Sequence, residues 1–419
     1  MKIYETKAGK SFKTPFLLVS SLFFLWGFAH AILEVLNPHF KDLMNLSHEN
    51  AAWVQAATYT AYFLMALPAG WIIRRHGYRS GVLTGLVLYG IGALLFLPIC
   101  LLGDTIGSIN VLYACFVGAL FVIGCGLTCL ETSANPYVTV LGDPSSAERR
   151  INLSQSLNGF GWICGPLVGG LLFFGGSETE SAAAAEGTSS VLSVAIPYTV
   201  VGIAVLLVAL VFKRSELPEV TEDESPAGTD KVGGELPLIR NGMFVFGVIS
   251  LFLYVAAQTG VNSNFVSYMV SNGDMTKETA SLWLSFGGMG LFMVGRILGS
   301  WLMNYIRAER LMGWLGIGAT VAAAVVVTSS GFTSMSAFLV IYLCESIMFP
   351  TIFALSLRGL AGSQTKLASS ILIMTIVGGA IAPLLMGRIA DAVGISMAFL
   401  VPLVCYIVIT VFSFSVKKR

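Results

Sequence analysis

Twelve apolar runs of about twenty residues each constrain this chain more than any other feature. A helix needs about 20 largely apolar residues to cross a bilayer. The runs lie at 16–36, 51–73, 81–102, 109–131, 152–175, 191–212, 242–270, 280–303, 311–330, 336–357, 367–387 and 395–416. Charged residues make up 11% of the 419 residues, whereas a soluble chain carries about 25%. The sequence therefore predicts an all-α integral membrane protein with twelve transmembrane helices.

The twelve runs fall into two groups of six that repeat each other. A charged segment rich in Pro and Gly, residues 213–241, separates residues 1–212 from residues 242–419. The string ETSANPYVTVLG of the first part matches ESIMFPTIFALSL of the second, which pairs Pro136 with Pro350. Two six-helix halves in parallel repeat predict the major facilitator architecture, with a substrate site near the bilayer midplane between the halves.

Basic residues predict how the helices are oriented in the membrane. An even number of spans places both chain ends on one side, and twenty basic residues collect there, whereas only Lys41, Lys277 and Arg388 lie on the other side. Because Lys and Arg are enriched in cytoplasmic loops, both termini are predicted to be cytoplasmic. The run 16–36 is too long for a signal-peptide core and is predicted to be a retained first helix.

Three acidic residues inside the apolar runs are the strongest candidates for function. Glu34, Glu131 and Glu345 each lie within or beside a predicted span, where a charge costs about 3 kcal/mol even on lenient scales. Such a carboxyl can carry a proton and bind a substrate, or it can make a structural hydrogen bond inside the bundle. The two interpretations weigh equally for Glu345. His30 precedes Glu34 by one helical turn and could interact with it.

Amide side chains form a second group of candidates. Gln155 and Asn158 are three residues apart, and Gln258 and Asn262 are four apart, so each pair shares one helix face. Amides offer donors and acceptors together, which suits a neutral ligand with many hydroxyls. The alternative is hydrogen bonding between helices.

A charged segment between two spans is a candidate gate. Glu148, Arg149 and Arg150 follow the predicted span 109–131 and precede the span 152–175. They could form a gate pair, and a solvated charge cluster is an equal alternative.

Several other classes of protein are excluded or disfavoured. The net charge of +1 argues against nucleic-acid binding. The chain has no P-loop, no nucleophile elbow and no cluster with metal-ligand spacing. Its seven cysteines are odd in number, lie in apolar runs and form no CxxC motif, so a disulfide scaffold is not expected. We therefore expect neither an enzyme, nor a metal site, nor a cofactor.

Five stretches resemble the fucose–galactose–glucose:proton symporter family. They read FFLWGFAHAILEVLNPHF, CLETSANPYVTVLG, NLSQSLNGFG, FLYVAAQTG and SIMFPTIFAL…IVGGAIAP. The similarity runs through both halves of the chain. It implies the major facilitator fold and transport of a sugar coupled to protons.

The resemblance assigns roles to two of the acids. Glu34 stands where the family has an acid on its first helix, usually Asp in an NDxL string, although Leu33 replaces the asparagine. This match implies that Glu34 is the main protonation site. Glu131 matches the family's glutamate in the CLETxANP string, which implies that it binds sugar and couples binding to protonation.

The same resemblance extends to the amides and to one aromatic residue. It implies that Gln155, Asn158 and Gln258 hydrogen-bond sugar hydroxyls. Phe349 stands where fucose-transporting members have a tyrosine, so that hydroxyl is missing, whereas glucose/galactose members share the FPTIF string.

We therefore predict a monomeric symporter of a bacterial inner membrane that imports a neutral monosaccharide with a proton as the coupling ion. L-Fucose is the first choice of sugar, and glucose, galactose or an N-acetylhexosamine are the alternatives. A proton-antiport exporter on the same fold and a non-transporting membrane sensor are the rival functions. The predicted sugar site comprises Glu131, Gln155, Asn158, Gln258, Asn262, His30, Phe349 and Glu345.

Overall fold

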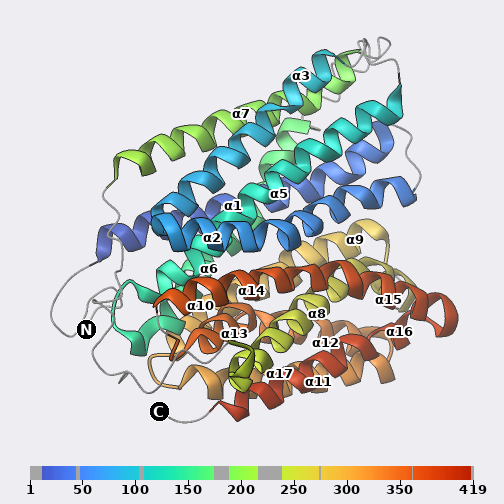
Figure 1. The fold of residues 1–419 in the computed structure, drawn as a ribbon. Coiled ribbons are helices and arrows are strands. Elements are labelled where there is room, and N and C mark those ends of the chain that lie inside the picture. Colours follow the sequence, from blue (N-terminus) through green and yellow to red (C-terminus); the bar gives the residue numbers. More distant parts are fainter. Residues whose placement is uncertain are drawn as a thin grey trace. The chain divides into compact units, whose positions relative to one another are not determined.

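The protein is an assembly of helices (Figure 1). The computed structural model describes residues 12–43, 48–102, 108–173, 188–215, 238–272, 275–360 and 362–416. Within these ranges, side chains are not described at 29–30, 32–43, 48–56, 109, 166–173, 188–194, 277–278 and 362–363. Most of the charged segment 213–241, residues 216–237, lies outside the described residues.

The first six predicted spans are long helices. They are α1 (Lys13–Leu43), α2 (His48–Leu94) with the short α3 (Phe96–Leu101), α5 (Ile109–Val140), α6 (Ala147–Phe173) and α7 (Thr188–Arg214). A single 3-10 turn, η1 (Pro144–Ser146), connects α5 to α6. The helix α2 carries two predicted spans, and between them Gly77 takes φ 84°. That left-handed backbone favours glycine and breaks the helical path.

The last six predicted spans are more often interrupted. They comprise α8 (Gly242–Asn272), α9 (Lys277–Leu282), η4 (Trp283–Met289), α10 (Gly290–Leu302), α11 (Ala308–Thr328), α12 (Gly331–Glu345), α13 (Met348–Leu357), α14 (Gly362–Met374), η5 (Thr375–Val377), α15 (Gly378–Val393), α16 (Ile395–Ala398) and α17 (Leu400–Ser415). One interruption, η4, is a π-helical segment, and such segments often lie near functional sites.

The described helices have the lengths and compositions of membrane spans. Nine helical segments of the described chain are long and apolar enough to cross a bilayer. The number is below twelve partly because α2 joins two predicted spans, and because side chains of α1 and α6 are described over only part of each helix. Each of the twelve predicted runs coincides with helix.

The helix α7 exposes a row of apolar side chains that would be unfavourable in water. Ile196, Val200, Ile203 and Leu207 recur every three or four residues and are half or more exposed. The opposite face is equally apolar and is buried. A helix that is hydrophobic all round needs lipid or protein on every side.

The chain forms two compact units. One contains Ser21–Ala134 and Phe160–Glu219, and the other contains Met1–Ser20, Asn135–Gly159 and Val220–Arg419. The boundary between them therefore runs through α5 and α6. The division at residues 213–241 that the sequence indicates stays a prediction.

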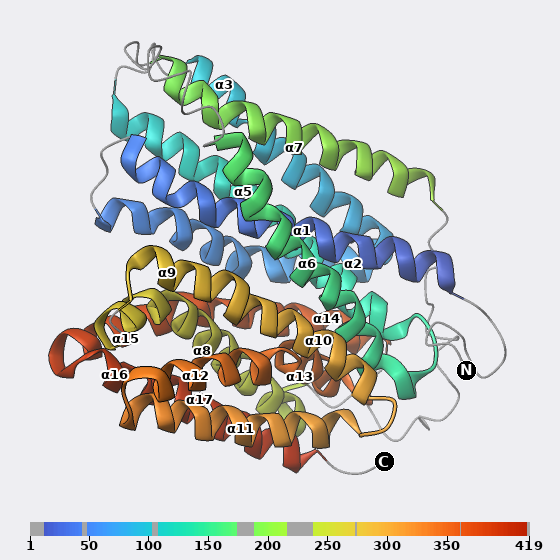
Figure 2. The same cartoon turned by 180° about the vertical axis from the view of Figure 1, so that it is seen from behind.

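Within the larger unit, α11 lies beside α12 and α17, and α8 packs on α13, α15 and α17. Figures 1 and 2 show α11, α12 and α17 as neighbours from both sides. Aromatic rings fill the space between these helices, with Phe338 in edge contact with Phe265 and Phe399. The Tyr268 hydroxyl donates to the Val326 carbonyl oxygen at 2.8 Å, so its polar end is satisfied.

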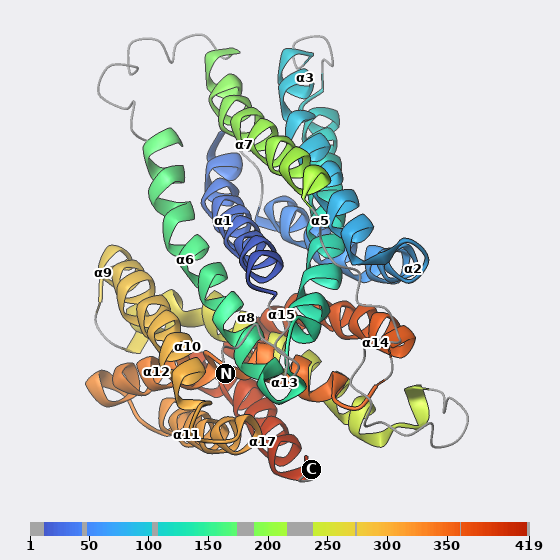
Figure 3. The same cartoon turned by 90° about the vertical axis from the view of Figure 1, so that its left-hand side faces the viewer.

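Within the smaller unit, α7 packs on α2 and α3 (Figure 3). The rings of Phe96 and Tyr198 stack with centroids 3.9 Å apart. The helices α2 and α5 approach closely at Gly85 and Gly126. A Cβ atom on Gly126 would lie 2.5 Å from the Tyr89 nitrogen and 2.7 Å from the Gly85 oxygen.

This close approach predicts a position-specific effect of adding one methyl group. We expect Gly126→Ala to lower the free energy of unfolding by about 1–3 kcal/mol, because the new Cβ overlaps with backbone that cannot rotate away. Gly118→Ala on the same helix is the matched control, since a Cβ there meets nothing within 4 Å. Thermal unfolding of both variants in detergent measures the difference. Equal melting temperatures for the two variants would contradict this close packing of α2 against α5.

Candidate functional site

Glu131 lies in the C-terminal half of α5, in the smaller unit, and is 7% exposed. Its Oε1 accepts a hydrogen bond from the Tyr62 hydroxyl of α2 at 2.5 Å. A carboxyl inside the membrane-spanning part of a helix needs such a donor, because lipid offers none. The pairing orients the Glu131 carboxyl.

Glu345 occupies the matching position of the repeat but a different local structure. It ends α12, and the chain leaves the helix at Ser346 and Ile347 before α13 begins. Pro350 lies in the first turn of α13, where its missing N–H is tolerated. The other proline of the repeat, Pro136, lies inside the unbroken α5. The repeated sequence therefore produces a continuous helix once and a broken helix once.

The carboxyl of Glu345 is fully buried and also bonds to a tyrosine. Its Oε1 accepts from the Tyr406 hydroxyl of α17 at 2.5 Å. The Tyr254 hydroxyl of α8 donates to the Glu345 carbonyl oxygen at 3.2 Å. These bonds connect the broken helix to two neighbouring helices of the same unit.

Gln155 of α6 is held by an arginine from α10. The Arg296 Nη1 donates to the Gln155 carbonyl oxygen at 2.7 Å and to its Oε1 at 3.2 Å. The Gln155 Nε2 donates to Asn135 Oδ1 at 3.3 Å. Arg296 also donates from Nε to the Ser346 carbonyl oxygen at 2.9 Å and lies over the Phe292 ring. A single buried guanidinium thus joins α6, α10 and the break between α12 and α13.

The remaining predicted site residues are placed as follows. Asn158 is buried on α6, whereas Gln258 and Asn262 are half-buried on α8. The Asn262 Oδ1 is a buried atom with no hydrogen-bond partner among the described residues. Phe349 is half-buried, with its ring centroid 6.2 Å from that of Tyr254. Of the predicted set, Gln155, Glu345 and Phe349 are thus connected through Arg296 and Tyr254.

The predicted first-helix residues His30 and Glu34 lie on α1, but their side chains are outside the described residues. Their roles stay predictions.

Sequence reasoning did not assign a role to Arg296 or to the tyrosines that bond the acids. Arg296 carries a signal that could have found it, because an arginine inside the apolar run 280–303 costs as much to bury as an acid does. Tyr62 and Tyr406 carry no such signal. Tyrosines commonly pack between membrane helices, and only the fold shows that these two hydroxyls lie beside carboxyl groups.

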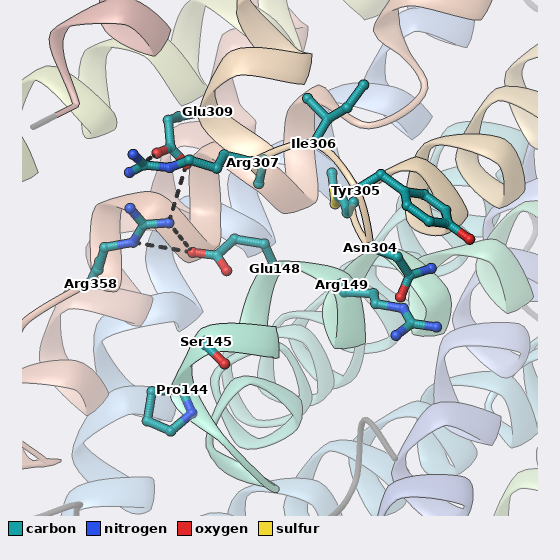
Figure 4. A pocket seen from close by; sticks show the side chains of 12 residues that line it. Pro144, Ser145, Glu148, Arg149, Asn304, Tyr305, Ile306, Arg307, Glu309 and Arg358 are labelled. Atoms are coloured by element: carbon teal, nitrogen blue, oxygen red, sulfur yellow. Dashed lines mark hydrogen bonds and ion pairs between the residues drawn. The ribbon is translucent and has the colours of Figure 1, made fainter. Parts of the chain in front are cut away.

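A charged cluster lies where α10 leads into α11 and where α13 ends, with the start of α6 beside it (Figure 4). Arg358 donates from Nη2 to Glu148 Oε1 at 2.6 Å and lies 3.6 Å from Glu309 Oε2. Arg307 pairs with the same Glu309. Burial lowers the pKa of the Arg358 guanidinium, but the charges and hydrogen bonds of Glu148 and Glu309 outweigh it and raise that pKa. The cluster lines a cavity of about 420 Å³.

Glu148 of the candidate gate segment therefore pairs with Arg358, and the gate role itself stays a prediction. Arg150 is completely buried and stabilises the connection between α5 and α6. It donates to the carbonyl oxygens of Val138, Thr139 and Asp143 and to Ser146 Oγ. Burial lowers the pKa of Arg150 to about 10, and the nearby acids Glu148 and Asp143 act in the opposite direction.

The sequence also matches a known protein family. Residues 17–375 match the Major Facilitator Superfamily.

The chain belongs to the major facilitator superfamily.

It is therefore a multi-pass membrane protein of a transporter family rather than an enzyme, and the predicted fold class is confirmed. Among curated relatives, the glucose/galactose transporter of Brucella abortus is 37% identical over 96% of this chain and 94% of its own length. The L-fucose-proton symporter of Escherichia coli is 35% identical over 96% and 93%. The resemblance to the fucose–galactose–glucose:proton symporter family is thereby confirmed.

Solved structures agree with this placement of the facilitator. The transporter FucP in its outward conformation matches with a TM-score of 0.84 and 33% identity, covering 97% of this chain and 99% of that one. The proton:xylose symporter XylE matches with a TM-score of 0.73 and 13% identity over 96% of this chain and 94% of that chain. At that identity the second likeness concerns the fold alone.

The Glu148–Arg358 pair predicts an energetic coupling that a double-mutant cycle measures. We expect Glu148→Gln and Arg358→Gln each to destabilise the protein, and the double variant to be more stable than the sum of the single effects predicts. The coupling should be about 1–3 kcal/mol, because the charged hydrogen bond is largely shielded from water. Thermal unfolding in detergent provides the free energies. Purely additive effects would show that the pair contributes nothing.

Proposed function

We propose that this facilitator is a proton-coupled symporter that imports a neutral monosaccharide. The observation that carries the proposal is similarity along 96% of the chain to a glucose/galactose transporter and to an L-fucose-proton symporter. Buried acids on helices of a membrane transporter supply the groups that proton coupling needs.

Glu131 is the proposed link between the sugar and the proton. A buried carboxyl that already accepts one hydrogen bond from Tyr62 can bind a sugar hydroxyl through its other oxygen. Protonation removes the charge before the loaded carrier reorients, which lowers the cost of moving that group through a low dielectric. Glu34 on α1 is the proposed main protonation site, and His30 is its proposed neighbour.

The proposed sugar contacts come from amides on α6 and α8. Gln155, Asn158, Gln258 and Asn262 are buried or half-buried, and they can pair with hydroxyls as donors or acceptors. Phe349 supplies an apolar surface where fucose-transporting members have a tyrosine.

L-Fucose, D-galactose and D-glucose are the sugars to test first, and N-acetylglucosamine follows. Identities of 37% and 35% to the two kinds of relative do not favour one sugar over the others.

The proposed setting is a bacterial inner membrane, with a monomer whose two termini are cytoplasmic. Two six-helix halves, residues 1–212 and 242–419, would alternate access around the sugar. The charged cluster of Glu148, Arg358 and Glu309 would then lie at the cytoplasmic ends of its helices. One charge crossing ~100 mV supplies about 2.3 kcal/mol, so one proton could sustain roughly fifty-fold accumulation of sugar.

Uptake into proteoliposomes tests the function directly. With an inward proton gradient we expect radiolabelled L-fucose, D-galactose or D-glucose to accumulate, and a pH electrode should record alkalinisation of the medium when the sugar is added. A protonophore should reduce uptake to equilibration, because the driving force is the proton gradient. Absence of uptake for every sugar, combined with efflux of amphipathic dyes, would favour the rival exporter instead.

Substitution of the two acids separates binding from coupling. We expect Glu131→Ala to weaken sugar binding at least tenfold, because the buried sugar loses a charged hydrogen-bond partner. Tyr62→Phe is its milder control, since it removes only the donor to Glu131. Glu34→Gln should abolish sugar-driven proton uptake while sugar exchange continues. Unchanged affinity in the first variant, or unchanged proton uptake in the third, would remove that residue from its proposed role.

A further inference from the structure

Glu345 is a buried acid, and the proposed proton coupling through Glu34 and Glu131 gives it no role. Its side chain is completely buried at the end of α12, where the helix breaks. Its Oε1 has one donor, the Tyr406 hydroxyl, and its Oε2 has no hydrogen-bond partner among the described residues. An ionised carboxylate can accept about four hydrogen bonds, so the described surroundings leave this group far from saturated.

The groups around Glu345 come from three helices. The titratable and charged members are Tyr254 of α8, Arg296 of α10, Tyr406 and Cys405 of α17, and the adjacent Cys344. Arg296 is the cation of this set. It reaches the peptide next to the acid, because its Nε donates to the Ser346 carbonyl oxygen at 2.9 Å. Tyr254 contacts both the Arg296 guanidinium and the Glu345 backbone.

The same guanidinium also bonds to Gln155, a residue of the proposed sugar site. Its Nη1 donates to the backbone oxygen and to the side-chain Oε1 of Gln155 on α6. Arg296 therefore contacts an amide that we assign to sugar binding and, at the Ser346 carbonyl oxygen, the backbone beside a carboxyl that is short of donors. A charged partner attracts a guanidinium more strongly than a neutral amide does.

We propose that Glu345 is a second proton-exchanging carboxyl of the symporter, and that its ionisation draws Arg296 away from Gln155. The inference rests on the proposed sugar–proton symport and adds a proton site to it. In this proposal Glu345 is neutral while its proton is bound, and Arg296 then holds Gln155 through the two hydrogen bonds of the structure. When the carboxyl releases its proton to water entering between the helices, the carboxylate keeps the Tyr406 hydrogen bond and gains Arg296 as a counter-ion.

This exchange has a direct consequence for the packing of α6 against α10. Losing the Arg296 bonds frees Gln155 and removes a connection between those helices. Because the α12–α13 break lies at the acid itself, the backbone there can adjust without disrupting a continuous helix. Proton release at Glu345 is thereby coupled to loosening of the helix that carries a sugar-binding amide.

The decisive variant is Glu345→Gln, which keeps the size and the Tyr406 bond but cannot ionise. Glu345→Asp is its control, because it keeps the exchangeable proton. In proteoliposomes, the wild type and Glu345→Asp should carry one more proton per sugar than Glu345→Gln. At ~100 mV the accumulation ceiling of Glu345→Gln should be about fifty-fold lower. An unchanged proton-to-sugar ratio in Glu345→Gln overturns the proposal and leaves the acid a structural hydrogen-bond partner.

A second measurement does not depend on the sugar. Infrared difference spectra of the reconstituted protein between acidic and alkaline pH should contain a carboxylic-acid C=O band that Glu345→Gln lacks and Glu345→Asp keeps. Identical spectra for the wild type and Glu345→Gln overturn the proposal. If no sugar moves protons in the wild type, the proposed symport fails, and the infrared comparison still decides whether Glu345 exchanges a proton.

Discussion

The absence of water in the bilayer core governs the polar chemistry of this protein. Lipid cannot satisfy a donor, an acceptor or a charge, so each buried polar group must find its partner within the protein. The Tyr62–Glu131 and Tyr406–Glu345 pairs solve this problem in the same chemical way, with a phenol donating to a carboxyl. The phenols come from α2 and α17, in the second and the last of the twelve predicted spans. The two acids repeat in sequence, but their surroundings do not.

The break between α12 and α13 concentrates three kinds of interaction in one place. The helix end exposes backbone oxygens that would otherwise be bonded within the helix, and Arg296 and Tyr254 use two of them. The helix α5 instead continues without a break through Glu131 and Pro136. A second acid, a cation and an interrupted backbone thus coincide in the part of the fold that also contacts Gln155. Transporters often use interrupted helices at ion and substrate sites, and this arrangement follows that logic.

Much of the fold could be predicted from the sequence, because apolar length alone determines where a chain can cross lipid. Each predicted run is helical, and the loss of helix between Glu345 and Met348 was signalled only indirectly, by Pro350. The site was less predictable. The burial cost of a charge identifies Glu131 and Glu345, and the same argument applied to Arg296 would have identified it as well. Partners such as Tyr406 depend on which helices become neighbours, and a single sequence with no periodic signal at that position does not contain this information.

The residues of the charged cluster around Arg358 should differ in how well they tolerate substitution. One cation there serves two acids, Glu148 and Glu309, while Arg307 serves only the second. Loss of either acid leaves Arg358 with a counter-charge. Loss of Arg358 leaves Glu309 with Arg307 but removes the ion-pair partner of the largely buried Glu148. Substitution of one acid of the cluster should therefore be tolerated more readily than substitution of Arg358. The arrangement of charge thus constrains the order in which substitutions can accumulate in this facilitator.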